Sequence, residues 1–262
     1  MIYSPKIMGI LNITPDSFYD GDSKLTKKTL LSKIQNLTES DIIDIGCESS
    51  RPGANSISID KEIKRLDKVI SFMDYFNDIK LSIDTYKYEV AKYAVNHGFT
   101  MINDITAGTH NPKIFNLVAK NDLEIVLMHM QGKPKNMQSN PKYENLIDEI
   151  LVFFESRISV ALKEGIKEEK IIIDPGIGFG KTLNDNIEII KNIKTFKKLG
   201  FRVLLGHSRK TFLQYNNNLP KERFSASIGV SAYAAMEKID ILRVHDVNDT
   251  RSMLNTINKL TA

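Results

Sequence analysis

The stretch M-G-I-L-N-I-T-P-D-S-F-Y-D-G-D, at residues 8–22, contains the pattern on which the fold assignment rests. It begins with a short apolar run that ends at Asn12, and a run of this length is typical of a strand buried on both faces. The residues that follow favour turns and carry oxygen atoms. A rigid strand that ends in an exposed polar loop is a common way to present catalytic groups, although an ordinary surface turn would have a similar sequence.

The same unit of an apolar strand, a polar loop and a helix recurs along the chain. Eight such units in 262 residues predict one parallel (β/α)₈ barrel, because about 250 residues is typical of that fold. An open dinucleotide-binding sheet is disfavoured, since no G-x-G-x-x-G follows the first strand. The expected later strands lie at 41–46, 81–83, 100–102, 124–130, 171–173, within 202–210 and at 241–244, and the clearest helices at 25–39, 57–76, 114–119, 146–164, 187–199 and 253–260.

Composition is that of an ordinary globular protein, with 42% hydrophobic and 26% charged residues and no linker or low-complexity block. We therefore expect a single domain over residues 1–262. The 36 basic and 32 acidic residues are dispersed, which argues against nucleic-acid binding. No apolar run approaches the ~18 residues of a membrane span and no signal-peptide layout opens the chain, so a cytoplasmic protein is expected. Cys47 is the only cysteine, which excludes an intrachain disulfide.

Polar residues follow the apolar run of nearly every unit. The carboxyl ends of all strands of a (β/α)₈ barrel meet at one face, so these residues are expected to form one pocket. A strand-end aspartate can also simply cap the next helix, and a lone lysine is usually solvated, but the repetition of such residues favours a site. The candidates are Asn12, Ser50, Asp84, Asn103, Asp174, Lys210, Arg243 and His245.

The chemistry of these side chains matches a flat, nitrogen-rich heterocycle such as a pterin. A carboxylate accepts hydrogen bonds from an amino group and an adjacent ring N–H together, and a lysine suits a ring carbonyl oxygen. The run D-P-G-I-G-F-G-K at 174–181 allows close backbone approach to a ligand and presents Phe179 as a flat apolar wall. Arg243 and His245 alternate onto the same side of a strand, where both could meet an anion. His129 we interpret as structural.

The chain resembles the dihydropteroate synthase family over essentially its full length. The resemblance rests on motifs that occur in the family's order and spacing: G-I-L-N-I-T-P-D-S-F, E-S-S-R-P-G, I-D-T, N-D-I, M-H-M-Q-G, D-P-G-I-G-F-G-K, S-R-K and R-V-H-D-V. It implies a transferase that joins p-aminobenzoate to 6-hydroxymethyl-7,8-dihydropterin diphosphate, yielding dihydropteroate for folate synthesis and releasing pyrophosphate. It also implies a homodimer formed through the later helices, for which the apolar segment 228–236 is a candidate.

The resemblance further implies a role for each matching residue. Asn12 would bind Mg²⁺ on the diphosphate, Asp20 would support the first loop, and Arg243 would stack on the pterin ring. The other roles are pterin binding by Asp84, Asn103, Asp174 and Lys210; diphosphate binding by Ser50, Arg243 and His245; and p-aminobenzoate binding by Arg51, Pro52, Phe179, Lys210 and Thr211. Ser50 stands where the family usually has threonine, and Cys47 and Ala226 stand where glycine is common.

We expect a dissociative substitution in which Asp84 stabilises a cationic pterin while Mg²⁺, Arg243 and His245 stabilise the leaving diphosphate. The neutral aromatic amine then attacks, so that no strong general base is needed. Asp84, Lys210, Arg243 and His245 are the expected catalytic residues. Two alternatives remain: a pterin-binding methyltransferase domain, which would not need the S-R-K and R-V-H motifs, and a pterin-binding module without catalytic activity.

Overall fold

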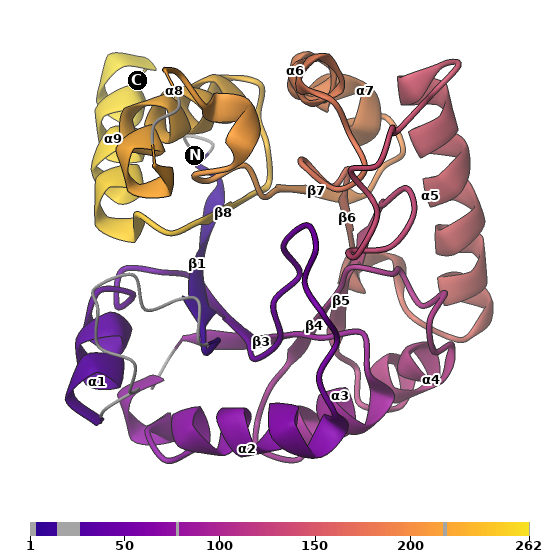
Figure 1. The fold of residues 1–262 in the computed structure, drawn as a ribbon, viewed down its shortest axis with the longest axis vertical. Helices are drawn as coiled ribbons and strands as arrows, with labels where there is room; N and C mark the ends of the chain where they lie inside the picture. Colours follow the sequence, from indigo (N-terminus) through magenta and orange to yellow (C-terminus); the bar gives the residue numbers. More distant parts are fainter. Residues whose placement is uncertain (1–3, 15–26, 77–78, 217–218, 262) are drawn as a thin grey trace.

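A computed structural model describes residues 4–14, 27–76, 79–216 and 219–261 of the chain. The described strands form one closed barrel in which each strand pairs with the next along the chain and β8 returns to β1, all in parallel (Figure 1). The (β/α)₈ prediction is therefore confirmed. The strands are β1 (Lys6–Asn12), β2 (Ile42–Gly46), β3 (Lys80–Asp84), β4 (Met101–Asp104), β5 (Glu124–Met128), β6 (Ile171–Asp174), β7 (Arg202–Leu205) and β8 (Ile241–Val244).

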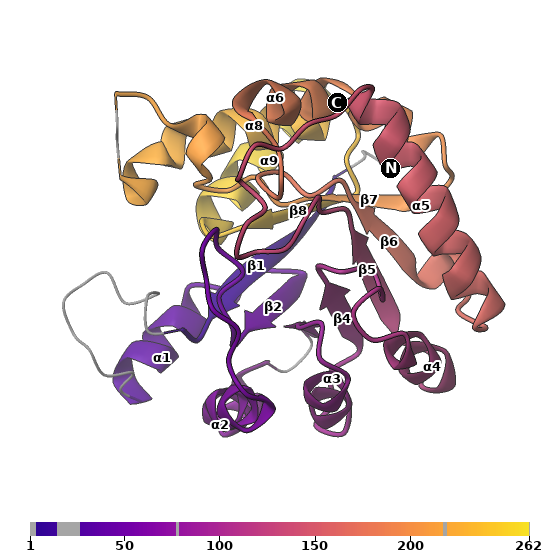
Figure 2. The ribbon, with the colours of Figure 1, turned by 45° about the vertical axis from the view of Figure 1, so that its right-hand side comes forward.

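Helices surround the barrel and cover the outer face of the strands (Figures 1 and 2). Among the residues that the structure describes, no helix has the length and apolar character needed to cross a lipid bilayer. The α-helices are α1 (Lys27–Gln35), α2 (Ile59–Ile70), α3 (Tyr88–Val95), α4 (Lys113–Lys120), α5 (Leu146–Lys163), α6 (Leu183–Lys191), α7 (Ile193–Lys197), α8 (Phe224–Met236) and α9 (Val247–Thr261). Short 3₁₀ turns lie at η2 (Met73–Phe76), η3 (Glu168–Lys170), η4 (Thr211–Leu213) and η5 (Pro220–Arg223).

Several element boundaries differ from those expected. The helix expected at 57–76 is α2 followed by the short turn η2, and the helix expected at 187–199 divides into α6 and α7 at Asn192. The closing helix, expected at 253–260, already begins at Val247. Its first two turns are mostly polar and bury only Val247 and Thr250, so the apolar periodicity becomes visible only later.

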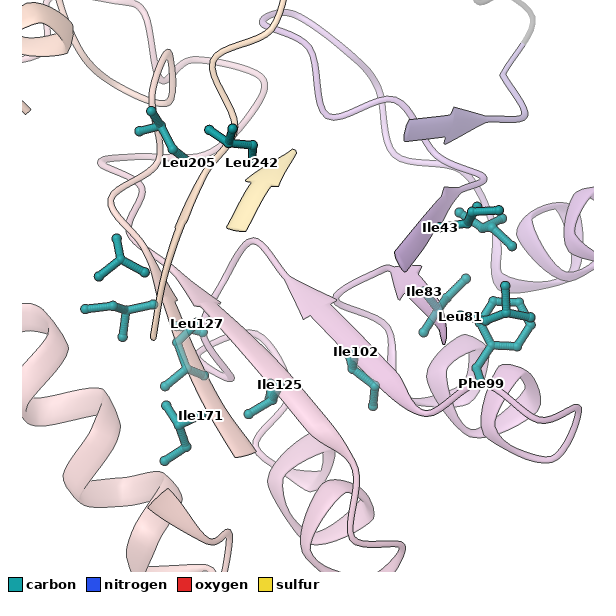
Figure 3. Packing of buried hydrophobic residues seen from close by; sticks show 14 of the residues in the cluster. Ile43, Leu81, Ile83, Phe99, Ile102, Ile125, Leu127, Ile171, Leu205 and Leu242 are labelled. Carbon is teal, nitrogen blue, oxygen red and sulfur yellow. The ribbon is translucent and has the colours of Figure 1, made fainter. Parts of the chain in front are cut away.

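Apolar side chains form two layers, because successive residues of a strand point to opposite faces. The outward side chains pack beneath the helices as the main core (Figure 3). The inward ones fill the barrel, as is usual for this fold. This interior layer consists of Met8, Ile42, Met101, Val126, Ile172, Leu204 and Ile241.

Ion pairs and hydrogen bonds of charged side chains link the amino-terminal ends of the strands. Glu124, the first residue of β5, forms ion pairs with Lys80 and Arg202, the first residues of β3 and β7. Asp41, just before β2, accepts a hydrogen bond from the backbone N–H of Ile7 at 2.7 Å. Groups at this end of a (β/α)₈ barrel contribute to stability, whereas function is located at the opposite face.

Candidate active site

A polar layer lies directly above the apolar interior, toward the carboxyl ends of the strands. Each of four of its members stands two residues after a member of the interior layer and therefore points the same way. These four are Asp44, Asn103, Asp174 and Arg243, and all belong to strands. The register of the sheet adds Asp84, which pairs with Gly46 on one side and with Asn103 on the other.

Arg243 is the centre of this layer. Its Nε donates to Asp44 Oδ2 at 2.7 Å and its Nη2 donates to Asp84 Oδ2 at 2.7 Å. Asn103 Nδ2 donates to the same oxygen of Asp44 at 2.9 Å. Arg243, Asp84 and Asn103, predicted as site residues, are thus brought together through Asp44, which the sequence reasoning did not include.

The layer holds more buried carboxyl groups than cationic groups. One guanidinium faces two carboxylates, and Asp44 is fully buried, with an Oδ1 atom that lacks a hydrogen-bond partner among the described residues. Burial raises the pKa of Asp84 to about 7; the charge of Arg243 opposes this shift, and the charge of Asp44 adds to it. Such a site favours a ligand that donates hydrogen bonds or carries positive charge.

Asp174, a member of the polar layer, and Lys210, which follows β7, form the neighbouring part of the site. Asp174 Oδ1 accepts the backbone N–H of Gly176 at 2.8 Å, and a Cβ atom added at Gly206 would lie only 3.7 Å from its other oxygen. Lys210 Nζ donates to the carbonyl of Ile177 and lies 4.5 Å from the centroid of the Phe179 ring. Burial lowers the pKa of Lys210 to about 8, against the attraction of Asp174.

His245 follows β8 and contacts the S-R-K segment. Its Nδ1 lies 3.0 Å from Ser208 Oγ, and its backbone N–H donates to the same oxygen at 3.2 Å. Burial lowers the pKa of His245 to about 3, and the charges of Arg209, Arg243, Arg51 and Lys210 lower it further. The imidazole is therefore neutral near pH 7 and surrounded by cations, which is an arrangement suited to an anion.

The loop between β2 and α2 lies over the ring of strands (dark purple in Figure 1). Its residues Arg51 and Pro52 are exposed and Ser50 is half-buried. The backbone N–H of Gly53 donates to the carbonyl of Pro134, in the loop after β5, at 3.1 Å. Thr211 is exposed as the first residue of η4. Arg51, Pro52 and Thr211 are among the residues predicted for the second substrate, and Ser50 is predicted for the diphosphate.

Asn12 ends β1 beside the same layer. A Cβ atom added at Gly46 would lie 2.9 Å from Asn12 Oδ1 and 3.6 Å from Asp84 Oδ2. Within the described ranges there is no group of three or more acidic, histidine or cysteine residues able to hold a metal ion. One amide oxygen fits Mg²⁺ only in company with ligand oxygens and water, which is how this ion usually binds beside phosphates. Asp20 lies outside the described residues.

Two contacts were not anticipated from the sequence. Asp44 stands between isoleucines inside a strand, and its position two residues after Ile42 is the signal that could have revealed it. Lys181, only 3% exposed, lies 3.0 Å from His129 Nδ1 and donates to the carbonyl of Phe179 at 3.0 Å. Burial, reinforced by Lys181, lowers the pKa of His129 to about 2, in line with a structural histidine.

Comparison with known proteins identifies the family. The model of the pterin binding enzyme family matches residues 8–245. A dihydropteroate synthase from Synechocystis is 40% identical over 245 residues, which is 92% of this chain and 85% of that protein. The chain belongs to the dihydropteroate synthase family. The Escherichia coli family member is 37% identical over 259 residues, covering 97% of this chain and 90% of its own.

Solved structures of the family share this fold. The Yersinia pestis dihydropteroate synthase in complex with a sulfonamide drug has a TM-score of 0.91 and 38% identity, covering 98% of this chain and 94% of its own. The Xanthomonas albilineans enzyme with 4-aminobenzoic acid has a TM-score of 0.90 and 36% identity, covering 98% of this chain and 93% of its own. Members of this family are transferases of folate synthesis, and the fold and family expected from the sequence are both confirmed.

Proposed function

We propose that the protein condenses 6-hydroxymethyl-7,8-dihydropterin diphosphate with p-aminobenzoate to give 7,8-dihydropteroate and pyrophosphate. The observation that carries this proposal is the single layer in which Asp84, Asn103 and Asp174 lie with Lys210 at the carboxyl ends of the strands. The carboxylates accept the paired N–H donors of a pterin, and the Lys210 ammonium donates to its carbonyl oxygen. Family membership supports the same reaction.

In the proposed mechanism the bond between the pterin methylene carbon and the diphosphate oxygen breaks first, and its electron pair leaves with the diphosphate. Asp84 stabilises the positive charge that spreads over the pterin ring, because a nearby cation favours the ionised form of this buried carboxyl group, whose pKa is raised to about 7 in the free protein. The amine nitrogen of p-aminobenzoate then bonds to the methylene carbon and loses a proton to water. No strong general base is required.

The leaving diphosphate is held by Ser50, Arg243 and His245. His245, neutral in the free protein, donates one hydrogen bond, and the cationic groups around it complement the charge of the anion. Asn12 would hold Mg²⁺ together with diphosphate oxygens, and the ion, when bound, supplies positive charge at the leaving group. Arg51, Pro52, Phe179 and Thr211 would form the pocket for p-aminobenzoate, with Lys210 shared between the two substrates.

We further propose that one domain spans residues 1–262, that the protein acts in the cytoplasm, and that it forms a homodimer. An apolar groove between η4, α6 and α8 supports a second copy as the partner; it is lined by Ile187, Ile190, Lys191, Phe212, Leu213, Val230 and Tyr233. Met236, the last residue of α8, lies three residues after Tyr233 in the sequence and is 68% exposed. An exposed apolar surface of this kind on an outer helix is typical of a protein interface.

The deciding experiment is pyrophosphate release from the pterin diphosphate with and without p-aminobenzoate. Release that depends on p-aminobenzoate, together with formation of dihydropteroate, is the expected result. A methyltransferase domain or a binding module without activity would bind the pterin and release no pyrophosphate in response to p-aminobenzoate. Omission of Mg²⁺ should slow the wild-type reaction, and this test separates the metal proposal from the reaction itself.

A further inference from the structure

A buried ion cluster lies behind the active site, outside the residues assigned above. Lys87 Nζ donates to Glu48 Oε2, to Glu62 Oε2 and to the carbonyl of Ile57, each at 2.7 Å. Thr85 Oγ1 donates to Glu62 Oε1, also at 2.7 Å. The side chains of Lys87 and Glu48 are 9% exposed and that of Glu62 is fully buried. We refer to Glu48, Glu62, Thr85 and Lys87 as the Lys87 cluster.

This cluster joins the two ends of the loop between β2 and α2. Glu48 Oε1 accepts the backbone N–H of Ile57 at 2.8 Å, while Lys87 binds both the Glu48 carboxylate and the Ile57 carbonyl. Residues 49–56 are therefore a loop whose two ends are held together by side chains at its base. One ammonium group is shared by two carboxylates, so each buried charge has a partner of opposite sign.

The same loop reaches the mouth of the barrel. Its tip is hydrogen-bonded to the loop after β5 through Gly53 and Pro134, and the charge of Arg51 acts on His245, which follows β8. Thr85 and Lys87 lie one and three residues after Asp84, the last residue of β3. The Lys87 cluster thus connects the strand that presents Asp84 with the base of the loop that presents Arg51.

We propose that Glu48 and Lys87 are positioning residues, which fix the base of this loop so that Arg51 and Pro52 meet the second substrate. The inference rests on the proposed function. Buried ion pairs contribute little net stability in comparison with apolar residues, and a role in fixing one conformation is the better explanation for three charges at this place. A small displacement at the base becomes a larger one at the tip, where the aromatic amine has to be aligned for attack.

The test compares two glutamates, Glu48 and Glu124, which lie at opposite ends of the barrel. Each of them is bonded to two groups. Glu48→Gln removes one charge from the Lys87 cluster but leaves Lys87 paired with Glu62. The matched control is Glu124→Gln, because the Glu124 side chain is 10% exposed, close to the 9% of Glu48, and also pairs with cations. We expect Glu48→Gln to raise the KM for p-aminobenzoate by at least about fivefold, with the Kd for pterin diphosphate within roughly twofold of wild type.

Glu124→Gln should leave the KM for p-aminobenzoate and the Kd for pterin diphosphate unchanged, even if it lowers the melting temperature as much as Glu48→Gln does. Equal changes in both constants, or an unchanged KM in Glu48→Gln, would overturn the inference. Glu48→Asp, which keeps the charge but shortens its reach, serves as a second variant, and hydrogen exchange of residues 49–56 should be faster in both Glu48 variants than in Glu124→Gln. Wild-type protein without p-aminobenzoate-dependent pyrophosphate release would instead contradict the proposed function, whatever the exchange rates.

Discussion

Arg243, on the last strand, donates to Asp84, on the third strand, at 2.7 Å, and so joins residues that are 159 positions apart in the chain. The same guanidinium donates to Asp44 at 2.7 Å. Because Arg243 holds two carboxylates at once, its position depends on both of them. A change at either carboxylate should therefore affect the geometry of the other, and this coupling leads to the first prediction.

Asp44→Asn should weaken binding of the pterin diphosphate by about tenfold or more. The amide presents a donor where Arg243 and Asn103 both donate, and it removes buried negative charge from the layer. Calorimetric titration measures the affinity. Asp41→Asn is the control, since Asp41 accepts from Ile7 at the other end of β2 and should affect stability alone. Equal affinity in the two variants would rule out a role for Asp44.

Asp174→Asn tests the assignment of Asp174 to the paired donors of the pterin. The substitution replaces one acceptor by a donor, and an unpaired buried donor costs roughly 1 to 3 kcal/mol. We expect at least about a tenfold loss of affinity for a pterin in a calorimetric titration. Asp174 would have to be removed from the site if the affinity stayed the same.

His245 should remain neutral in the free protein between about pH 5 and 8, because its pKa is lowered from 6.5 to about 3 by burial and nearby cations. Its contribution to stability is present above pH 6.5 and is lost as the pH falls toward 3. Bound pyrophosphate should raise this pKa, since an anion favours the imidazolium. Imidazole NMR shifts, assigned with His245→Gln, give both values.

His207 supplies an internal control for that titration. It is fully buried, lies 2.9 Å from Ser231 Oγ of α8, and has a pKa lowered to about 4, chiefly by burial. Pyrophosphate should shift the titration of His245 and leave that of His207 in place. A shift of both histidines, or of neither, would contradict diphosphate binding at His245.

The fold was predictable because strands of a parallel barrel are apolar on both faces and differ sharply from the amphipathic helices between them. The last strand shows this, since 241–244 was expected and β8 spans Ile241–Val244. Helix breaks were harder to foresee. The apolar spacing continues through Asn192, where α6 ends and α7 begins, so the pattern alone does not show the break.

The site was predictable in part for an equally physical reason. Asp84, Asn103 and Asp174 stand at strand ends, where a polar residue is conspicuous after an apolar run. Asp44 stands inside β2 and looks like an interruption of that strand. Its partner Arg243 lies 199 positions away, and no local pattern connects two residues so distant in the sequence.

Arg51→Ala should affect the use of p-aminobenzoate without affecting the binding of pterin diphosphate. Arg51 is exposed on the loop after β2 and does not belong to the polar layer, so pterin diphosphate binding should be nearly intact. The KM for p-aminobenzoate should rise roughly tenfold, because only the assembled second pocket uses this side chain. Steady-state kinetics with each substrate varied in turn will measure both. A parallel loss of pterin affinity would be inconsistent with this division.

Tyr233→Glu should weaken the proposed homodimer. Tyr233 is 42% exposed and lines the groove between α6, η4 and α8, where a buried charge would be costly. Sedimentation at micromolar concentration should give twice the 29.7 kDa of one chain for wild type and a single chain for the variant. Tyr75→Glu is the control, since Tyr75 is 53% exposed in η2 and should leave assembly unchanged. A wild-type protein that sediments as one chain would contradict the dimer.

The closure of the barrel between β1 and β8 has a consequence for protein synthesis. Residues 6–9 pair with 241–244, and Arg243 reaches Asp44 and Asp84 only from that closed position. During translation, a chain whose β8 segment has not yet emerged from the ribosome lacks both the β1–β8 pairing and the guanidinium group of Arg243. The nascent polypeptide therefore stays unable to complete its pterin pocket until nearly the whole barrel sequence has emerged, and binding competence appears in one late step.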